Sequence, residues 1–165
     1  MRIFWVDERC VPVKDSDSNY GTMLRLLLRE VGMPDEFVFP IDGACRHPEK
    51  EAKRYSDLVF GTVPLRRGFP AFDLVLLGAG DDGQEYLLSS FHPYEASVNP
   101  YNGQPRIAMT GCLLFNARKI VFLITGKNKT DVVYDIMKSG DTGPAAYVAH
   151  HAESVDIFTD VEIAG

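Results

Sequence analysis

The sequence predicts an α/β fold with a Rossmann-like, mostly parallel sheet and flanking helices. Three short segments are apolar at every position, a pattern typical of parallel strands buried on both faces: 3–6, 74–77 and 120–124. Segments with helical periodicity alternate with these strands, as they do in parallel α/β sheets. We therefore expect residues 1–165 to form a single α/β domain.

The first helix is expected after the first strand and a loop. Ser18 or Asn19 can cap its start, and Gly32 and Pro34 stand where it should end. Its apolar residues recur at helical spacing and are expected in the core: Tyr20, Met23, Leu24, Leu27, Leu28 and Val31.

The remaining elements follow from shorter patterns. Further strands are expected at 37–39, 106–110 and 155–158. Helices or helical turns are expected at 49–60, 85–90, 113–117, 130–137 and 144–148. Proline and Asn-Gly signals predict irregular structure in 61–70 and 91–104.

Composition and charge narrow the class of partner. Of the 165 residues, 45% are hydrophobic and 24% charged, which suits a globular domain with a real core. The formal net charge of −6 argues against nucleic acid, because there is no basic surplus to neutralise phosphates. A small phosphorylated ligand needs only a few well-placed cations and remains compatible with this charge.

The cysteines and the apolar runs predict a cytoplasmic protein. Cys10, Cys45 and Cys112 are odd in number and widely spaced, so they suggest neither a C-x-x-C site nor a disulfide framework. We therefore expect a reducing compartment. The sequence contains no run of membrane-spanning length, and its start lacks the apolar core of a signal peptide.

Polar clusters are expected where the apolar strands end. The segment 78–83 reads Gly-Ala-Gly-Asp-Asp-Gly and follows strand 74–77, at the edge where open α/β sheets bind ligands. Two further clusters, 7–9 and 126–129, follow the other two apolar strands. We expect the three exits, at Arg9, Asp82 and Lys129, to converge on one pocket for a polar ligand that ends in an anion. The alternative is that the glycine-rich loop is only a strand exit.

Several motifs in this order resemble those of the 6-phosphogluconolactonases, within the superfamily that includes glucosamine-6-phosphate deaminases. Residues 4–12, Phe-Trp-Val-Asp-Glu-Arg-Cys-Val-Pro, and 17–20, Asp-Ser-Asn-Tyr, are similar to the start of the family signature. Residues 72–83 resemble its F-D-L-x-L-L-G-x-G-x-D-G motif. Shorter similarities follow at 106–110, 125–129 and 144–146.

The resemblance implies hydrolysis of 6-phosphoglucono-1,5-lactone to 6-phosphogluconate in the pentose phosphate pathway, without metal or cofactor. It places Asp82 and Gln84 at the catalytic positions. It implies that the substrate contacts Asp7, Arg9, Gly80, Gly83, Arg106 and Lys129. Arg9 and Lys129 are the cations expected to contact phosphate, Arg9 by a planar fork and Lys129 as a point charge.

Two departures from the family pattern bear on activity. Gln84 stands where the family has its catalytic histidine, and an amide cannot accept a proton as a general base does. The family's Gly-Gly-Ser-Thr-Pro phosphate loop has no counterpart before Asp7, so the domain is expected to be N-terminally truncated. Strand 3–6 should then expose an apolar edge, and we expect self-association through it.

Alternatives remain open for the function and for single residues. The chain is either such a hydrolase or an impaired paralogue that only binds sugar phosphates; isomerisation or deamination on the same fold is a further alternative. His92 could replace the missing base, although its irregular surroundings favour a surface position. Asp82 could merely stabilise a turn, and Arg9 or Lys129 could pair with Asp7 or Glu8 at the surface. His150 and His151 are expected to be structural.

Overall fold

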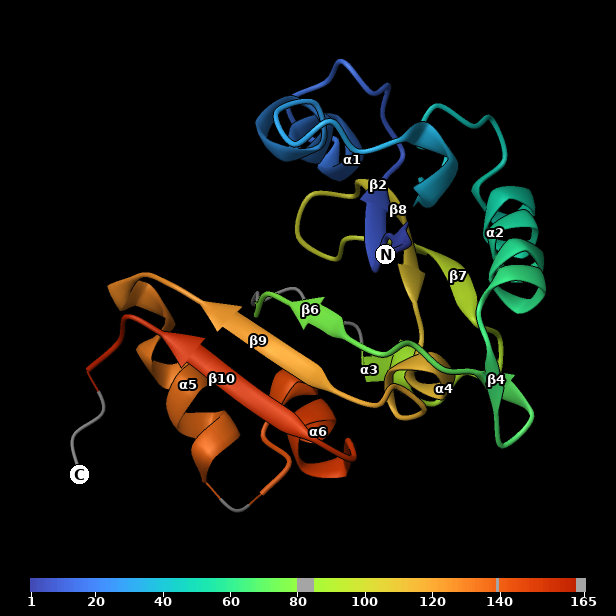
Figure 1. Ribbon diagram of the computed structural model, residues 1–165. Helices are drawn as coiled ribbons and strands as arrows, with labels where there is room; N and C mark the ends of the chain where they lie inside the picture. Colours follow the sequence, from blue (N-terminus) through green and yellow to red (C-terminus); the bar gives the residue numbers. More distant parts are fainter. Residues whose placement is uncertain (80–84, 139, 163–165) are drawn as a thin grey trace. The chain divides into compact units, whose positions relative to one another are not determined.

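The computed structural model describes residues 1–79, 85–138 and 140–162 (Figure 1). Internal contacts divide the chain into two compact units. Unit 1 comprises Met1–Leu58 and Tyr94–Met109, and unit 2 comprises Val59–Pro93 and Thr110–Gly165.

Unit 1 contains a three-stranded antiparallel sheet in the order β2-β8-β7. Its strands are β2 (Asp7–Arg9), β8 (Pro105–Met109) and β7 (Tyr94–Val98). The expectation that residues 7–9 form a strand exit is therefore wrong, because pairing with β8 overrides the low strand propensity of this charged tripeptide. The expectation of irregular structure at 94–98 is wrong as well. Pairing with β8 forms this strand, although Pro93 and Pro100 flank it.

A second, two-stranded sheet in unit 1 pairs β1 (Ile3–Phe4) with β3 (Val38–Phe39) in parallel. The rings of Phe4 and Phe39 stack at a centroid distance of 4.7 Å. Both residues of β1 are only half-buried, so the prediction of burial on both faces is wrong for them. A short run of apolar residues indicates that a strand can be buried. It does not show which elements cover each face of that strand.

Two buried tyrosines end β1 after two residues. The hydroxyl of Tyr55 accepts a hydrogen bond from Trp5 N at 2.9 Å and donates to Phe39 O at 2.6 Å. The hydroxyl of Tyr94 donates to Trp5 O at 2.9 Å. The backbone of Trp5 is thus satisfied by side chains in place of a strand partner, and its indole is 5% exposed.

The first helix begins as predicted and then departs from the expected register. Ser18 caps α1 (Asn19–Met23) by accepting a hydrogen bond from Gly21 N at 2.9 Å. The helix continues as a π-helical turn, η1 (Leu24–Leu28). Its wider spacing shifts the 3.6-residue stripe, so Leu27 and Val31 are 45% and 58% exposed and lie outside the core.

The next elements of the chain are η2 (Asp35–Phe37) and α2 (Pro48–Thr62). The inward positions predicted for α2 are confirmed at Ala52, Tyr55 and Val59, which are at most 3% exposed. Leu58, also predicted to face inward, is half-buried.

Unit 2 contains a fully parallel sheet in the order β10-β9-β6. Its strands are β6 (Val75–Leu77), β9 (Ile120–Ile124) and β10 (Val155–Thr159). Figure 1 shows α5 (Thr130–Met137) and α6 (Pro144–His151) on one side of this sheet. The predicted α/β class, with parallel strands and flanking helices, is confirmed.

Short elements complete unit 2. They are the helices α3 (Glu85–Leu88), α4 (Gly111–Leu114) and η3 (Lys127–Lys129) and the hairpin of β4 (Leu65–Arg66) and β5 (Phe69–Pro70). The hairpin lies in a segment that we expected to be irregular. Its turn uses Arg67 and Gly68, both with positive φ, of 53° and 81°.

The two faces of the parallel sheet differ in burial. Ile120, Phe122 and Ile124 are at most 1% exposed. On the other face, Leu76, Leu123 and Phe158 are 51–59% exposed. The prediction that these strands are buried on both faces is therefore wrong at Leu76, Leu123 and Phe158, whereas Val121 on the same face is 8% exposed. Within the described residues, no helix is long and apolar enough to cross a membrane.

Candidate active site

Two predicted substrate-binding arginines are neighbours in unit 1. The antiparallel register of β2 and β8 pairs Arg9 directly with Arg106, and Asp7 with Ala108. Directly paired residues project from the same face of a sheet with Cβ atoms about 5 Å apart. Arg9 and Arg106 therefore start from directly opposite positions on one face of the sheet, and Asp7, two residues before Arg9, projects from the same face. We call Arg9 and Arg106 the arginine pair.

Asn19 fixes the position of Arg9 beside Asp7. Its Nδ2 donates to both the backbone O and Oδ1 of Asp7, each at 2.9 Å, while its Oδ1 accepts from Arg9 Nη1. Arg9 Nη1 also donates to Asp17 O at 3.2 Å. A single amide therefore links the carboxylate to the guanidinium, and the N-terminus of α1 holds the arginine in place.

Glu8, between the two site residues of β2, points to the opposite face and is 1% exposed. Its Oε1 accepts hydrogen bonds from Arg9 N at 2.9 Å and Asn19 N at 2.8 Å. Its Oε2 accepts from Ser18 Oγ at 3.1 Å and Tyr20 N at 2.8 Å. This buried carboxylate joins β2 to the first turn of α1, where it complements the helix dipole.

The alternative that Arg9 pairs with Glu8 at the surface is wrong, because Glu8 is buried and the Arg9 guanidinium donates to Asn19 and Asp17. The sequence contains one signal for the role of Glu8, which is an acidic residue followed further along the chain by the helix cap Ser18. That signal is non-local, because the carboxylate reaches donors ten to twelve positions away.

The other predicted phosphate contact, Lys129, lies in unit 2. Because β6 and β9 are parallel neighbours, the segments that follow Leu77 and Ile124 leave the sheet at the same edge, as predicted for these two exits. After β9, Gly126 has a φ of 103°, and its N donates to Asp160 Oδ1 at 2.8 Å. Lys129 is half-buried at the start of α5, and its N donates to Gly126 O at 3.0 Å.

Four predicted site residues fall outside the described residues. They are Gly80, Asp82, Gly83 and Gln84. The structure brings together Asp7, Arg9 and Arg106 within unit 1. The expected convergence of Arg9, Asp82 and Lys129 on one pocket stays a prediction.

His92, His150 and His151 have local roles. His92 is exposed, and its N donates to Ser90 Oγ at 3.1 Å. His150 joins two segments of unit 2, with Nδ1 3.2 Å from Asp141 Oδ1 and Nε2 3.0 Å from Ile136 O. His151 Nδ1 lies 2.9 Å from Tyr147 O. The described part of the chain holds no cluster of three or more His, Cys, Asp or Glu residues that could bind a metal ion.

Comparison with known proteins identifies the family. The model of the glucosamine-6-phosphate isomerases/6-phosphogluconolactonase family matches residues 1–157. The chain belongs to this family. A 6-phosphogluconolactonase from Treponema pallidum (strain Nichols) is 34% identical over 163 residues, covering 92% of this chain and 64% of that protein. A 6-phosphogluconolactonase from Synechocystis is 34% identical over 156 residues, covering 90% and 65%.

A solved structure supports the same fold for this member of the family. The structure of 6-phosphogluconolactonase from Trypanosoma brucei superposes with a TM-score of 0.82 at 26% identity, covering 96% of this chain and 71% of that chain. The chain thus spans just under two thirds of the length of the two curated relatives above, at 64% and 65%.

Proposed function

We propose that this chain contributes the sugar-phosphate site of a 6-phosphogluconolactonase, an enzyme that hydrolyses 6-phosphoglucono-1,5-lactone to 6-phosphogluconate. The observation that carries the proposal is the arginine pair of β2 and β8 in a chain of this family. Like charges placed directly opposite each other destabilise a sheet. A bound phosphate offsets that repulsion, and guanidinium groups match its oxygens in a bidentate geometry.

The reaction needs little more than an anchor, a base and donors for an oxyanion. The oxygen of water forms a bond to the lactone carbonyl carbon, and the bond from that carbon to the ring oxygen breaks. One proton leaves the attacking water, and one reaches the ring oxygen as the ring opens. A general base speeds such a step by about 10²–10⁴-fold.

Gln84 decides how far the chain can catalyse this step. An amide can orient a water or hydrogen-bond a sugar hydroxyl, but it cannot take the proton. We therefore expect 6-phosphogluconate binding with slow turnover. The competing proposal, a sugar-phosphate binder without activity, shares the anchor and differs only in the rate.

The test is hydrolysis of 6-phosphogluconolactone at pH 7 by the parent chain and by Gln84→His. Restoring the base should raise turnover at least tenfold above the parent. A histidine introduced at exposed Val31, Val31→His, is the matched control and should leave the rate unchanged. If neither form hydrolyses the lactone faster than it hydrolyses spontaneously, but both bind 6-phosphogluconate, the chain is a sugar-phosphate binder without activity. Loss of binding as well would refute both proposals.

A second variant addresses His92. If the parent is already active and His92→Ala abolishes that activity, His92 serves as the base and Gln84 does not limit the rate. Release of ammonia from glucosamine-6-phosphate, measured on the same samples, tests the isomerase or deaminase alternative.

We further propose a cytoplasmic location, in keeping with the pentose phosphate pathway, and a phosphorylated sugar lactone as the partner. Self-association through the N-terminal edge at β1 stays a prediction. Light scattering across a concentration series tests it, and a constant monomer mass would contradict it.

A further inference from the structure

Two cysteines that are far apart in sequence meet in unit 1. The loop that contains Cys45 packs directly on the backbone that follows β2. A Cβ atom at Gly43 would lie 2.5 Å from Arg9 O and 2.6 Å from Val11 O, so only glycine permits this approach. The Cys10 and Cys45 thiols lie close enough for each to shift the pKa of the other, and both cysteines are free and half-buried.

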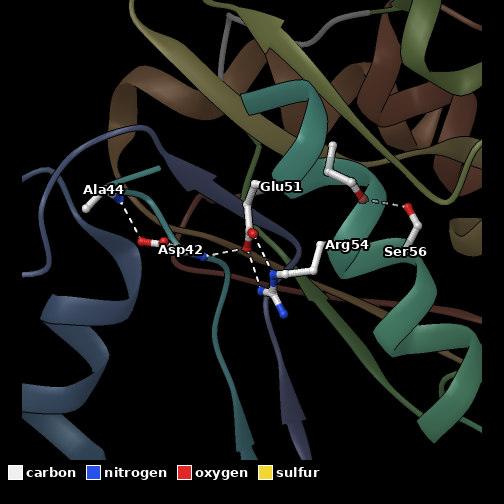
Figure 2. A network of polar contacts seen from close by, with 6 residues as sticks. Asp42, Ala44, Glu51, Arg54 and Ser56 are labelled. Carbon is white, nitrogen blue, oxygen red and sulfur yellow. Dashed lines mark hydrogen bonds and ion pairs between the residues drawn. The ribbon is translucent and has the colours of Figure 1, made fainter. Parts of the chain in front are cut away.

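Both ends of this contact are anchored. Cys10 N donates to Pro105 O at 2.9 Å, which ties it to the start of β8. On the other side, Figure 2 shows the polar network that holds the loop. Asp42 N donates to Glu51 Oε1 at 2.8 Å, and Ala44 N donates to Asp42 Oδ1 at 3.0 Å.

The carboxylate that anchors the loop is buried and paired. Glu51 is 6% exposed and forms an ion pair with Arg54, with Nε 2.6 Å from Oε2. Cys45 N donates to Asp42 O at 3.3 Å, so the cysteine belongs to the same turn. The backbone around both cysteines is therefore fixed by hydrogen bonds, by the close approach at Gly43 and by a buried carboxylate, independently of any bond between the sulfur atoms.

We propose that Cys10 and Cys45 form an oxidation site, at which a small disulfide such as oxidised glutathione converts them to a reversible intramolecular disulfide. The thiolate of one cysteine attacks a sulfur of the small disulfide, forming a mixed disulfide and releasing one glutathione thiolate. The second cysteine loses its proton and attacks the sulfur of the first, releasing the other glutathione. The two thiols lose two protons and two electrons in all, and oxidised glutathione takes them up to become two reduced molecules.

The surroundings make Cys45 the attacking residue. Burial is the main cause that raises the pKa of Cys10 to about 11, and the nearby Cys45, Glu8 and Glu49 raise it further. Burial also raises the pKa of Cys45, but the hydrogen bond from the Cys10 thiol lowers it and so favours the Cys45 thiolate. Cys10 is then the resolving thiol.

The acidic residues around Cys45 make the reaction pH-dependent. Asp42 and Glu51 raise the pKa of Cys45 in addition to burial, so at pH 7 little of the thiol is ionised. The rate of disulfide formation should therefore rise about tenfold per pH unit from pH 7 to 8.

The test uses the full chain, oxidised glutathione at pH 8, alkylation of remaining thiols, trypsin digestion and mass spectrometry. The expected product is a cross-link between peptides 10–14 and 30–46, which carry Cys10 and Cys45. Cys112 should be recovered alkylated or as a glutathione adduct. Cys112→Ser, the matched control, should keep the cross-link, and Cys10→Ser or Cys45→Ser should abolish it.

A second readout separates a structural disulfide from adventitious labelling. The bond closes a loop of about 35 residues, so the oxidised chain should melt roughly 5–10 °C higher than the reduced chain, and a thiol reductant should reverse the shift. Separate glutathione adducts on Cys10 and Cys45, links to Cys112 or links between molecules would each overturn the proposal. The peptide map of the parent chain shows whether Cys10 and Cys45 form the disulfide, even if a variant does not fold.

Discussion

Strands β2 and β9 are specified in opposite ways. Strand β9 (Ile120–Ile124) is apolar at every position, and its bounds could be predicted from its own residues. Strand β2 (Asp7–Arg9) is charged at every position, and its pairing with β8 and the hydrogen bonds from α1 to Glu8 hold it in place. The local pattern thus predicts where a buried strand runs. Strand β2, which carries the candidate site residues, depends instead on contacts with residues far away in the sequence.

Burial also differs within β9 itself, and the largest predicted effect tests this. Phe122 is 1% exposed and the adjacent Leu123 is 51% exposed. Phe122→Ala should lower the free energy of unfolding by about 3–5 kcal/mol, because it removes buried surface and leaves a cavity. Leu123→Ala should cost less than about 1 kcal/mol. Chemical denaturation measures both, and equal losses would show that the Leu123 face is covered.

The next effect concerns the buried carboxylate of β2. Glu8→Ala leaves four donors in and around the first turn of α1 without their acceptor. We expect a loss of about 2–4 kcal/mol in the free energy of unfolding. Asp156→Ala, which breaks an exposed ion pair with Lys119 at 2.7 Å in unit 2, is the control and should cost at most about 1 kcal/mol. Similar losses for the two variants would mean that Glu8 does not organise β2.

A smaller effect is expected at the tyrosine that ends β1. Tyr55→Phe keeps the ring but removes the hydroxyl that joins Trp5 N to Phe39 O, and it should cost about 1–2 kcal/mol. Burial raises the pKa of Tyr55 above its ordinary value of 10.0. Its contribution is therefore complete below pH 10 and decreases as the pH rises further, because the unfolded chain ionises first. Chemical denaturation at pH 8 and at pH 11 measures this. Between these two pH values, the free energy of unfolding should fall less for Tyr55→Phe than for the parent.

Local signals explain which parts of the fold could be predicted. The helix at Thr130–Met137 and the cap at Ser18 matched their predictions, because periodicity and capping chemistry lie within a few residues. The exposure of Leu27 could not be predicted, since the π-helical turn that causes it has no signal in the apolar spacing. The open face of the parallel sheet could not be predicted either, because an apolar run does not say what covers it.

The candidate site was only partly predictable for the same reason. Arg9 and Arg106 were identified through motifs, whereas their direct pairing depends on the register of β2 and β8. The contact of Cys10 with Cys45 depends on the close approach at Gly43 and has no signal in the cysteine spacing. The motifs assigned the catalytic positions to residues 80–84. Their roles remain a prediction, because these residues lie outside the described part of the chain.

The most direct test of the central claim is the preference of the chain for 6-phosphogluconate over gluconate, measured by calorimetry in the parent and in Arg106→Gln. If the arginine pair binds the phosphate, Arg106→Gln should weaken 6-phosphogluconate binding at least tenfold and leave gluconate binding within about twofold. Arg118→Gln, which removes an exposed arginine paired with Asp73 in unit 2, is the matched control and should change neither affinity. An unchanged preference for the phosphorylated ligand in Arg106→Gln would contradict the assignment of the arginine pair as the phosphate anchor.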